Sequence, residues 1–157
     1  MSEGVEWALH TCLNLTWLPD GQAVPTGRLA AFYELPPAYL NKQMQALARA
    51  GIVSSTPGPR GGFRLAREPE RITLLDIVVA IEGADEAFRC AELLKKGPGS
   101  DPATDYRQAC LISQAMHRAD LAWRRELAGQ TLAGLKASVE TTYPDAPSGT
   151  TDRLMGR

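Results

Sequence analysis

The sequence predicts a mainly α-helical protein with one small β-hairpin, namely a winged helix-turn-helix domain followed by a long dimerisation helix. Three observations support this fold class. Three amphipathic helical patterns fill the first 50 residues, and each ends at a proline or glycine. A glycine-rich hairpin pattern follows directly. A further amphipathic stretch of helical length then occupies residues 111–128.

The three N-terminal helices are predicted from their periodicity and their stop signals. The first covers residues 5–18 and ends at a Pro-Asp-Gly turn, and the second covers residues 26–33, with Thr26 as a candidate N-cap. Pro37 suits the first turn of a third helix, which Gly51 ends. The second and third helices, separated by a short turn, form the expected helix-turn-helix.

Residues 52–65 predict a hairpin, because a short apolar strand and an alternating strand flank a Pro/Gly-rich tip. In a winged helix, the third helix enters the major groove of DNA and the hairpin tip reaches the backbone or minor groove. Between residues 20 and 75, seven Lys and Arg outnumber four Asp and Glu, although the whole chain has a net charge of −1. The candidate DNA-binding residues are Arg28, Tyr39, Asn41, Lys42, Gln43, Arg60 and Gly61.

Beyond the hairpin, the pattern predicts a short helix over residues 73–82 and a long one over residues 111–128. The apolar stripe of the long helix consists of Ile112, Ala115, Met116, Ala119, Ala122 and Trp123. A compact winged helix leaves this stripe little core to cover, so we expect it to pair with a second copy in a homodimer. The polar, Pro/Gly-rich segment 141–157 is expected to be disordered.

The composition is that of an ordinary globular protein, with 44% hydrophobic and 22% charged residues in a chain of 157. No run approaches the roughly 18 apolar residues of a membrane span, and the N-terminus lacks the basic region of a signal peptide. We therefore expect a cytoplasmic protein without membrane contact. Three cysteines cannot form a complete disulfide framework, so metal or redox chemistry is the more natural use of the loop cysteines.

Cys90 and Cys110 stand at the two ends of a charged, glycine- and proline-rich stretch. Cys12 falls near the centre of the first helix's apolar stripe, which predicts a buried small hydrophobe and not a ligand. Glu6 and His10 lie about 40° apart on the flank of that stripe, one turn from each other, so they can bind one object. Two interpretations of Cys90 and Cys110 remain open at this point, namely ligands of a metal or cluster and inert buried thiols.

The segment "AYLNKQMQALARAGIVSSTPGPRGGFRLAREPERITLLDIVVAIEG" resembles the helix-turn-helix, wing and following helix of the Rrf-two family of bacterial regulators, which includes IscR and NsrR. The resemblance extends from about Val5 to Leu135. It implies a dimeric winged-helix transcription factor, often one that senses through an iron-sulfur cluster near the loop before the dimerisation helix. It also implies that Arg60 is the minor-groove residue of the wing.

Two widely separated loop cysteines and the string "GVEWALH" in the first helix are similar to the subgroup typified by the redox-sensitive regulator RsrR. That resemblance implies a [2Fe-2S] cluster ligated by Glu6, His10, Cys90 and Cys110. It further implies that Glu6 and His10 come from one protomer and the two cysteines from its partner. Trp7, beside Glu6, is the candidate side chain that responds to the state of the cluster.

The predicted organisation is a DNA-binding domain over 1–83, a cluster-binding loop over 84–110, a dimerisation region over 111–140 and a tail over 141–157. The predicted function is redox-sensitive transcription regulation at a double-stranded DNA operator. A cluster-free thiol-based or zinc-stabilised repressor is the alternative. A metalloenzyme with Glu6 as base is the least supported reading, because the sequence has no nucleotide motif and no nucleophile paired with a base.

Overall fold

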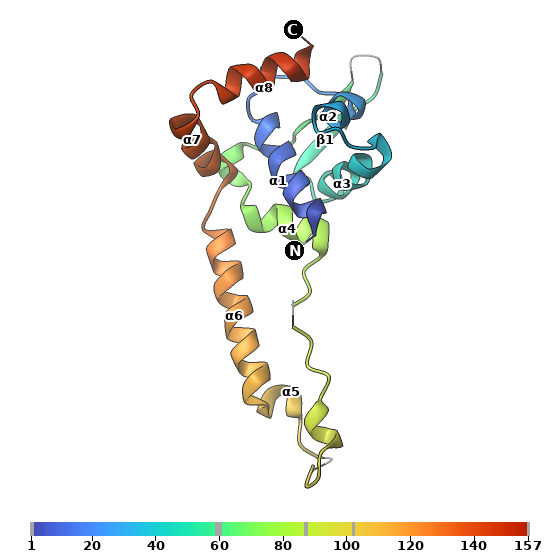
Figure 1. Ribbon diagram of the computed structural model, residues 1–157, viewed down its shortest axis with the longest axis vertical. Coiled ribbons are helices and arrows are strands. Elements are labelled where there is room, and N and C mark those ends of the chain that lie inside the picture. The colour runs from blue at the N-terminus through green and yellow to red at the C-terminus, as the bar shows by residue number, and fades with distance from the viewer. Residues whose placement is uncertain (1, 59–60, 87, 102, 157) are drawn as a thin grey trace.

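The computed structural model describes residues 2–58, 61–86, 88–101 and 103–156, which form a helical head and a stalk that extends from it (Figure 1). The head contains α1 (Glu3–Leu15), α2 (Thr26–Phe32), α3 (Pro37–Arg49), β1 (Val53–Thr56), β2 (Gly62–Leu65), η1 (Pro69–Arg71), α4 (Leu74–Glu82), α7 (Leu132–Thr142) and α8 (Ala146–Met155). The stalk contains η2 (Leu93–Lys96), α5 (Tyr106–Ala109) and α6 (Leu111–Ala128). The predicted mainly α fold with one hairpin is confirmed.

Local sequence signals account for the helix-turn-helix. Pro36 is the N-cap of α3 and Pro37 its first residue. Proline has no backbone N–H, and the first N–H groups of a helix have no acceptor within it, so no helical hydrogen bond is lost. Gly51, at φ +67°, ends it, since the N–H groups of Gly51 and Ile52 donate to the carbonyls of Ala48 and Leu47, each at 3.0 Å. The predicted N-cap of α2 is wrong by one residue: Pro25 occupies that position, and Thr26 is the first helical residue.

The wing is the two-stranded antiparallel sheet β1–β2, in which Val53 pairs with Leu65 and Thr56 with Gly62. Val24 extends it by exchanging backbone hydrogen bonds of 2.9 and 2.8 Å with Phe63. A Cβ on Gly61 would lie 2.0 Å from the Thr56 carbonyl oxygen, so the backbone itself requires glycine there. Arg60, the predicted minor-groove residue, lies outside the described residues.

The hydrophobic core lies inside the head, between α1, α3, α4 and the wing. Its largest fully buried side chains are Leu29, Leu40, Met44, Leu47, Ile52, Ile72, Ile77, Leu132, Leu154, Val5, Val24 and Val53. A capping box begins α4, because Thr73 and Asp76 each bind the other's backbone N–H, at 3.1 and 2.9 Å. Among the helices that the structure describes, none combines the length and hydropathy that a membrane span requires.

The region predicted for dimerisation contains two helices and not one. As predicted, α6 covers 111–128, but the chain then turns back, and the Leu132 N–H donates to the Ile72 carbonyl at 2.8 Å. This bond starts α7 against η1 and α1 of the head. Of these two helices, α6 belongs to the stalk and α7 to the head.

The structure corrects the expectation of a disordered tail. Residues 146–155 form α8, which packs on α1, α2 and α7. Leu154 is buried, and the Thr151 hydroxyl donates to the Trp17 carbonyl at 3.1 Å. The segment is polar overall, so its composition indicated disorder, whereas one buried leucine and a few polar contacts with the head hold the helix in place.

Candidate functional site

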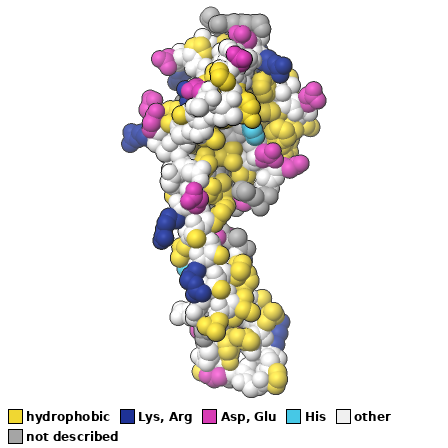
Figure 2. Space-filling view, turned by 60° about the vertical axis from the view of Figure 1, so that its left-hand side comes forward, with side chains coloured by type: hydrophobic (Ala, Val, Ile, Leu, Met, Phe, Trp, Pro, Cys, Tyr) yellow, Lys and Arg dark blue, Asp and Glu magenta, His cyan; other side chains and the backbone are white. Residues whose placement is uncertain are grey.

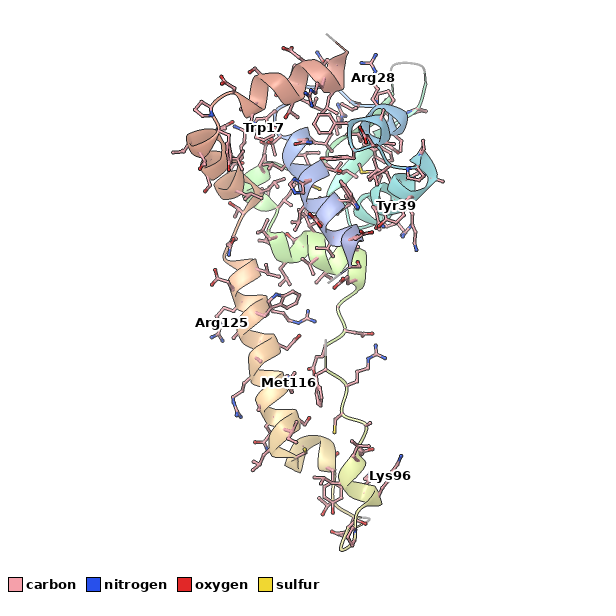
Figure 3. The ribbon with its side chains drawn as sticks, in the orientation of Figure 1. Trp17, Arg28, Tyr39, Lys96, Met116 and Arg125 are labelled. Atoms are coloured by element: carbon pink, nitrogen blue, oxygen red, sulfur yellow. The ribbon has the colours of Figure 1, made fainter. Side chains whose placement is uncertain are left out.

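The outward face of α3 presents three of the seven residues predicted to contact DNA. Asn41 and Lys42 are exposed and Tyr39 is half-buried; Figure 3 shows Tyr39 on α3. Gln45 is also exposed, one turn beyond Asn41. The sequence analysis missed Gln45, although its i+4 spacing from Asn41 was a usable signal.

Gln43 does not belong to this face. Its side chain is buried between α3 and the first turn of α1, and a Cβ on Gly4 would lie 2.9 Å from its Nε2 atom. Because α1 covers this side of α3, the amide of Gln43 is not presented to a DNA groove. We therefore replace Gln43 by Gln45 among the candidate reading residues.

Two other elements, the wing and α2, flank α3, which we call the reading helix. On the wing, Arg64 is exposed, and its Nε donates to Ser54 Oγ at 3.4 Å across the strands, while Gly61 is buried. On α2, Arg28 is exposed at the first turn. Its Nη1 donates to the Leu154 carbonyl at 3.3 Å, so the side chain lies beside the end of α8 (Figure 3).

Glu6 and His10 are both exposed on the same side of α1. They border a groove of about 660 Å³ that is otherwise largely apolar, with Leu74 of α4 and Leu135 and Val139 of α7 in its lining. A carboxylate and an imidazole one helical turn apart can bind one metal centre without rearrangement of the helix.

Cys12 lies on the opposite side of α1, fully buried in the core. Burial raises the pKa of its thiol to about 12, because a buried thiolate would lose its hydration. The thiol is therefore protonated at neutral pH and cannot approach a metal at the surface. The prediction that Cys12 is a buried hydrophobe is confirmed.

Cys90 and Cys110 belong to the stalk. Both are half-buried; Cys90 lines a hollow of about 760 Å³ beside α6, and Cys110 is the residue before α6. The structure thus separates the four predicted ligands into one pair on the head and one pair on the stalk (Figure 1). Within the described part of a single chain, no three His, Cys, Asp or Glu side chains gather as a metal site.

Polar contacts anchor the Cys90 loop to α6. His117 Nδ1 lies 2.9 Å from Glu86 Oε1, and Arg124 donates to the Asp85 carbonyl at 2.7 Å. Half of the His117 side chain is exposed to solvent, while its ring binds Glu86. These contacts fix the start of the loop on the same helix that Cys110 precedes.

The stalk exposes a large apolar surface on α6. Leu111 is 78% exposed, Ile112 67%, Met116 41% and Trp123 37%. Figure 2 shows hydrophobic side chains gathered along the stalk. Large exposed apolar patches are typical of interaction sites.

Trp7 connects the predicted ligand pair on α1 to the helix-turn-helix. Its ring meets the ring of Tyr33 edge-on, with centroids 5.1 Å apart, and Tyr33 is the residue at which α2 ends. Asn14 Nδ2 donates to the Tyr33 hydroxyl at 2.6 Å, and burial raises the pKa of Tyr33. The turn between α2 and α3 is therefore in direct contact with the helix that carries Glu6 and His10.

Comparisons with known proteins agree with this architecture. The sequence model of the family described as "Rrf2: Iron-dependent Transcriptional regulator" matches residues 1–138. YffB of Lactococcus lactis, whose name assigns it to the HTH-type transcriptional regulators, is 31% identical over 143 residues, which are 91% of this chain and 90% of that protein. YwgB of Bacillus subtilis, similarly named, is 27% identical over 91% of this chain and 88% of its own length.

Two solved structures are similar in fold. IscR of T. potens has a TM-score of 0.67 at 22% identity, with 91% of this chain and 90% of that chain covered. CymR of B. subtilis, described as the global cysteine regulator, has a TM-score of 0.65 at 22% identity, with 88% and 96% covered. At this identity the likeness extends to the fold alone.

Proposed function

Because the chain belongs to the Rrf2 family of transcriptional regulators, we propose that it is a dimeric, redox-sensing regulator with a [2Fe-2S] cluster held by Glu6, His10, Cys90 and Cys110. Its relatives are transcriptional regulators, and the chain is a regulator and not an enzyme. The observation that carries the proposal is the division of the donors. The pair on the head and the pair on the stalk are all accessible, while the third cysteine is buried and protonated.

The donor set suits such a cluster chemically. When bound, the cluster would supply a one-electron redox centre. Thiolates are the usual ligands of iron-sulfur clusters, and nitrogen donors in place of thiolates raise the reduction potential, as histidines do in Rieske centres. Cys90 and Cys110 would supply the thiolates, and His10 and Glu6 a neutral and an anionic donor.

Dimerisation would complete the site. Within one chain the two pairs of donors lie on different parts of the molecule, and a second copy is the simplest way to bring them together. Association through the exposed stripe of α6 would remove Ile112, Met116 and Trp123 from water, which favours it by about 25 cal/mol per Å² of apolar surface. Each dimer would then hold two equivalent sites.

The reading surface would act at a double-stranded operator, in the cytoplasm. Asn41, Lys42 and Gln45 lie on the exposed face of α3, where they can contact base edges and phosphates in the major groove. Tyr39 lies on the same helix, Arg28 lies on α2, and Gly61 lies in the wing. Arg60, which precedes Gly61 in the sequence, is the predicted minor-groove residue. Each base contact is expected to contribute about 1–3 kcal/mol of discrimination.

The ring contact between Trp7 and Tyr33 supports a route from the cofactor to DNA. A displacement of Trp7 would remove the edge-on support of Tyr33, at the turn that sets the angle between α2 and α3. In this proposal Trp7 moves in response to charge at the neighbouring Glu6, and the reading helix changes its position relative to the wing.

The alternative is a regulator of the same fold without a cluster, based on zinc or on thiol chemistry. Zinc also accepts two thiolates, an imidazole and a carboxylate. One solved neighbour, CymR of Staphylococcus aureus, is described in an oxidized form, with a TM-score of 0.63 at 24% identity. This alternative keeps Cys90 and Cys110 as the sensing residues.

Protein purified without oxygen distinguishes the two functions. We expect a red-brown solution with visible absorption, equal amounts of iron and acid-labile sulfide, and bleaching by strong chelators. A colourless protein that contains zinc, or no metal, would reject the cluster and favour the alternative. Mass spectrometry of the intact dimer under native conditions gives the number of clusters per dimer.

A further inference from the structure

The C-terminal helix α8 lies beyond residues 1–138, which the family model matches, yet it is built into the DNA-binding head. It contacts α1, α2 and α7. Leu154 anchors it in the core, and the Thr151 hydroxyl binds the backbone of Trp17. The position of α8 relative to α2 is therefore fixed by its contacts with three helices of the head.

The C-terminal end of α8 holds the guanidinium of Arg28. Nη1 donates to the Leu154 carbonyl at 3.3 Å. Gly156, at φ +71°, ends the helix, and a Cβ there would lie 3.2 Å from Nη1 and 3.3 Å from both Cζ and Nη2. Glycine thus leaves room for the guanidinium against the end of α8, where the free carbonyls favour a cation.

This contact leaves most of the guanidinium available. Arginine carries five N–H donors in a rigid, planar fork, and the described contact uses one of them. The residue is exposed, so the other donors can reach a ligand outside the protein. Since the side chain is already ordered, binding through it loses less conformational entropy than binding through a free arginine.

We propose that α8 is a positioning element of the DNA interface, which orients Arg28 toward a phosphate of the duplex backbone. The partner is the phosphodiester group, because the first helix of a helix-turn-helix crosses the DNA backbone and the planar fork suits phosphate oxygens. The inference rests on the proposed DNA interface and is independent of the cluster.

Gly156→Val in the full chain tests this role. The added side chain would occupy the space of the guanidinium and displace Arg28, while Leu154 stays in the core. Phosphate contacts do not depend on sequence, so the probe is a duplex of about 30 base pairs at several salt concentrations. We expect binding about fivefold weaker and a salt slope reduced by about 0.9, the contribution of one phosphate contact.

Gly149→Ala is the matched control, because a Cβ there meets nothing within 4 Å, and its binding should equal that of the wild type. The decisive background is Arg28→Gln, in which Gly156→Val should cause no further loss. An equal loss in both backgrounds, no loss, or tighter binding would overturn the role of α8. Gly156→Asn, which tolerates the left-handed backbone, repeats the cycle if the valine variant melts early. A wild-type protein that binds no duplex would instead reject the DNA interface itself.

Discussion

The three cysteines show how burial decides what one side chain can do. Cys12 is fully buried and its pKa is raised to about 12, so it packs as a small hydrophobe. Cys90 and Cys110 are half-buried in the stalk, where solvent or a ligand can reach them. Since the thiolate is the form that binds metals, only the two stalk cysteines have the environment of a ligand.

Alanine variants of the three cysteines separate these roles. Cys90→Ala and Cys110→Ala should abolish the visible absorption of anaerobically purified protein, because each removes a thiolate donor. Cys12→Ala should keep the spectrum and lower the free energy of unfolding by about 1 kcal/mol, through the small cavity it leaves. A bleached Cys12→Ala with a coloured Cys110→Ala would show that the ligands are wrongly assigned. His10→Ala should alter the spectrum while thermal melting stays close to that of the wild type.

At the scale of elements, α1 and α6 differ in where their apolar side chains lie. The buried face of α1 carries Val5, Ala8 and Cys12, and its exposed face carries Glu6 and His10. On α6, by contrast, the apolar residues themselves are exposed. Because its own chain leaves the apolar stripe of α6 exposed, a second molecule has to cover it. The apolar face of α1, by contrast, is buried within its own chain.

Ile112→Glu tests the role of α6, because it puts a charge on the 67% exposed isoleucine of the stripe. Burying a carboxylate at an apolar interface is unfavourable, so we expect a shift from dimer to monomer, measured by light scattering on a sizing column. Arg118→Glu, another exposed position of α6, is the control and should stay dimeric. A monomeric wild type that retains the cluster would contradict both the dimer and the shared site.

At the scale of the whole molecule, sensing requires that a change at α1 reaches α3. The described path is short: Glu6 neighbours Trp7, and Trp7 meets Tyr33 at the end of α2. A unit charge about 4 Å away interacts with a group by about 4 kcal/mol at an effective dielectric constant of about 20. Allosteric coupling typically needs about 1–3 kcal/mol, so one electron would suffice to bias the head between two arrangements.

We expect oxidised, reduced and cluster-free protein to bind one operator with different affinities at a fixed salt concentration, measured by anaerobic gel shift. Trp7→Ala should reduce the differences in operator affinity between the three states, since it removes the ring that contacts Tyr33. Arg60→Ala should weaken binding in all three states alike, because a groove contact does not depend on the cofactor. Equal affinities in the three states would leave a DNA-binding protein without a redox switch.

Much of the fold could be predicted from the sequence, because its signals are local. Helical periodicity located α6 at 111–128, and Pro37 and Gly51 marked the start and end of α3. The same periodicity placed Cys12 in the core and Glu6 beside His10 on the surface. Each of these features depends on residues within a few turns of each other, so the chain specifies them wherever the element finally packs.

Only the tertiary structure decided what depends on distant partners. Gln43 is buried because Gly4 of α1 packs against it, although the pattern of α3 alone allows an exposed side chain. The tail forms α8 because Leu154 is buried in the core of the head and the Thr151 hydroxyl donates to the Trp17 carbonyl. The path of the chain likewise separates Glu6 and His10 from Cys90 and Cys110. Periodicity determines which face of an element is apolar, whereas which surface covers that face follows from contacts across the whole sequence, and these have no local signature.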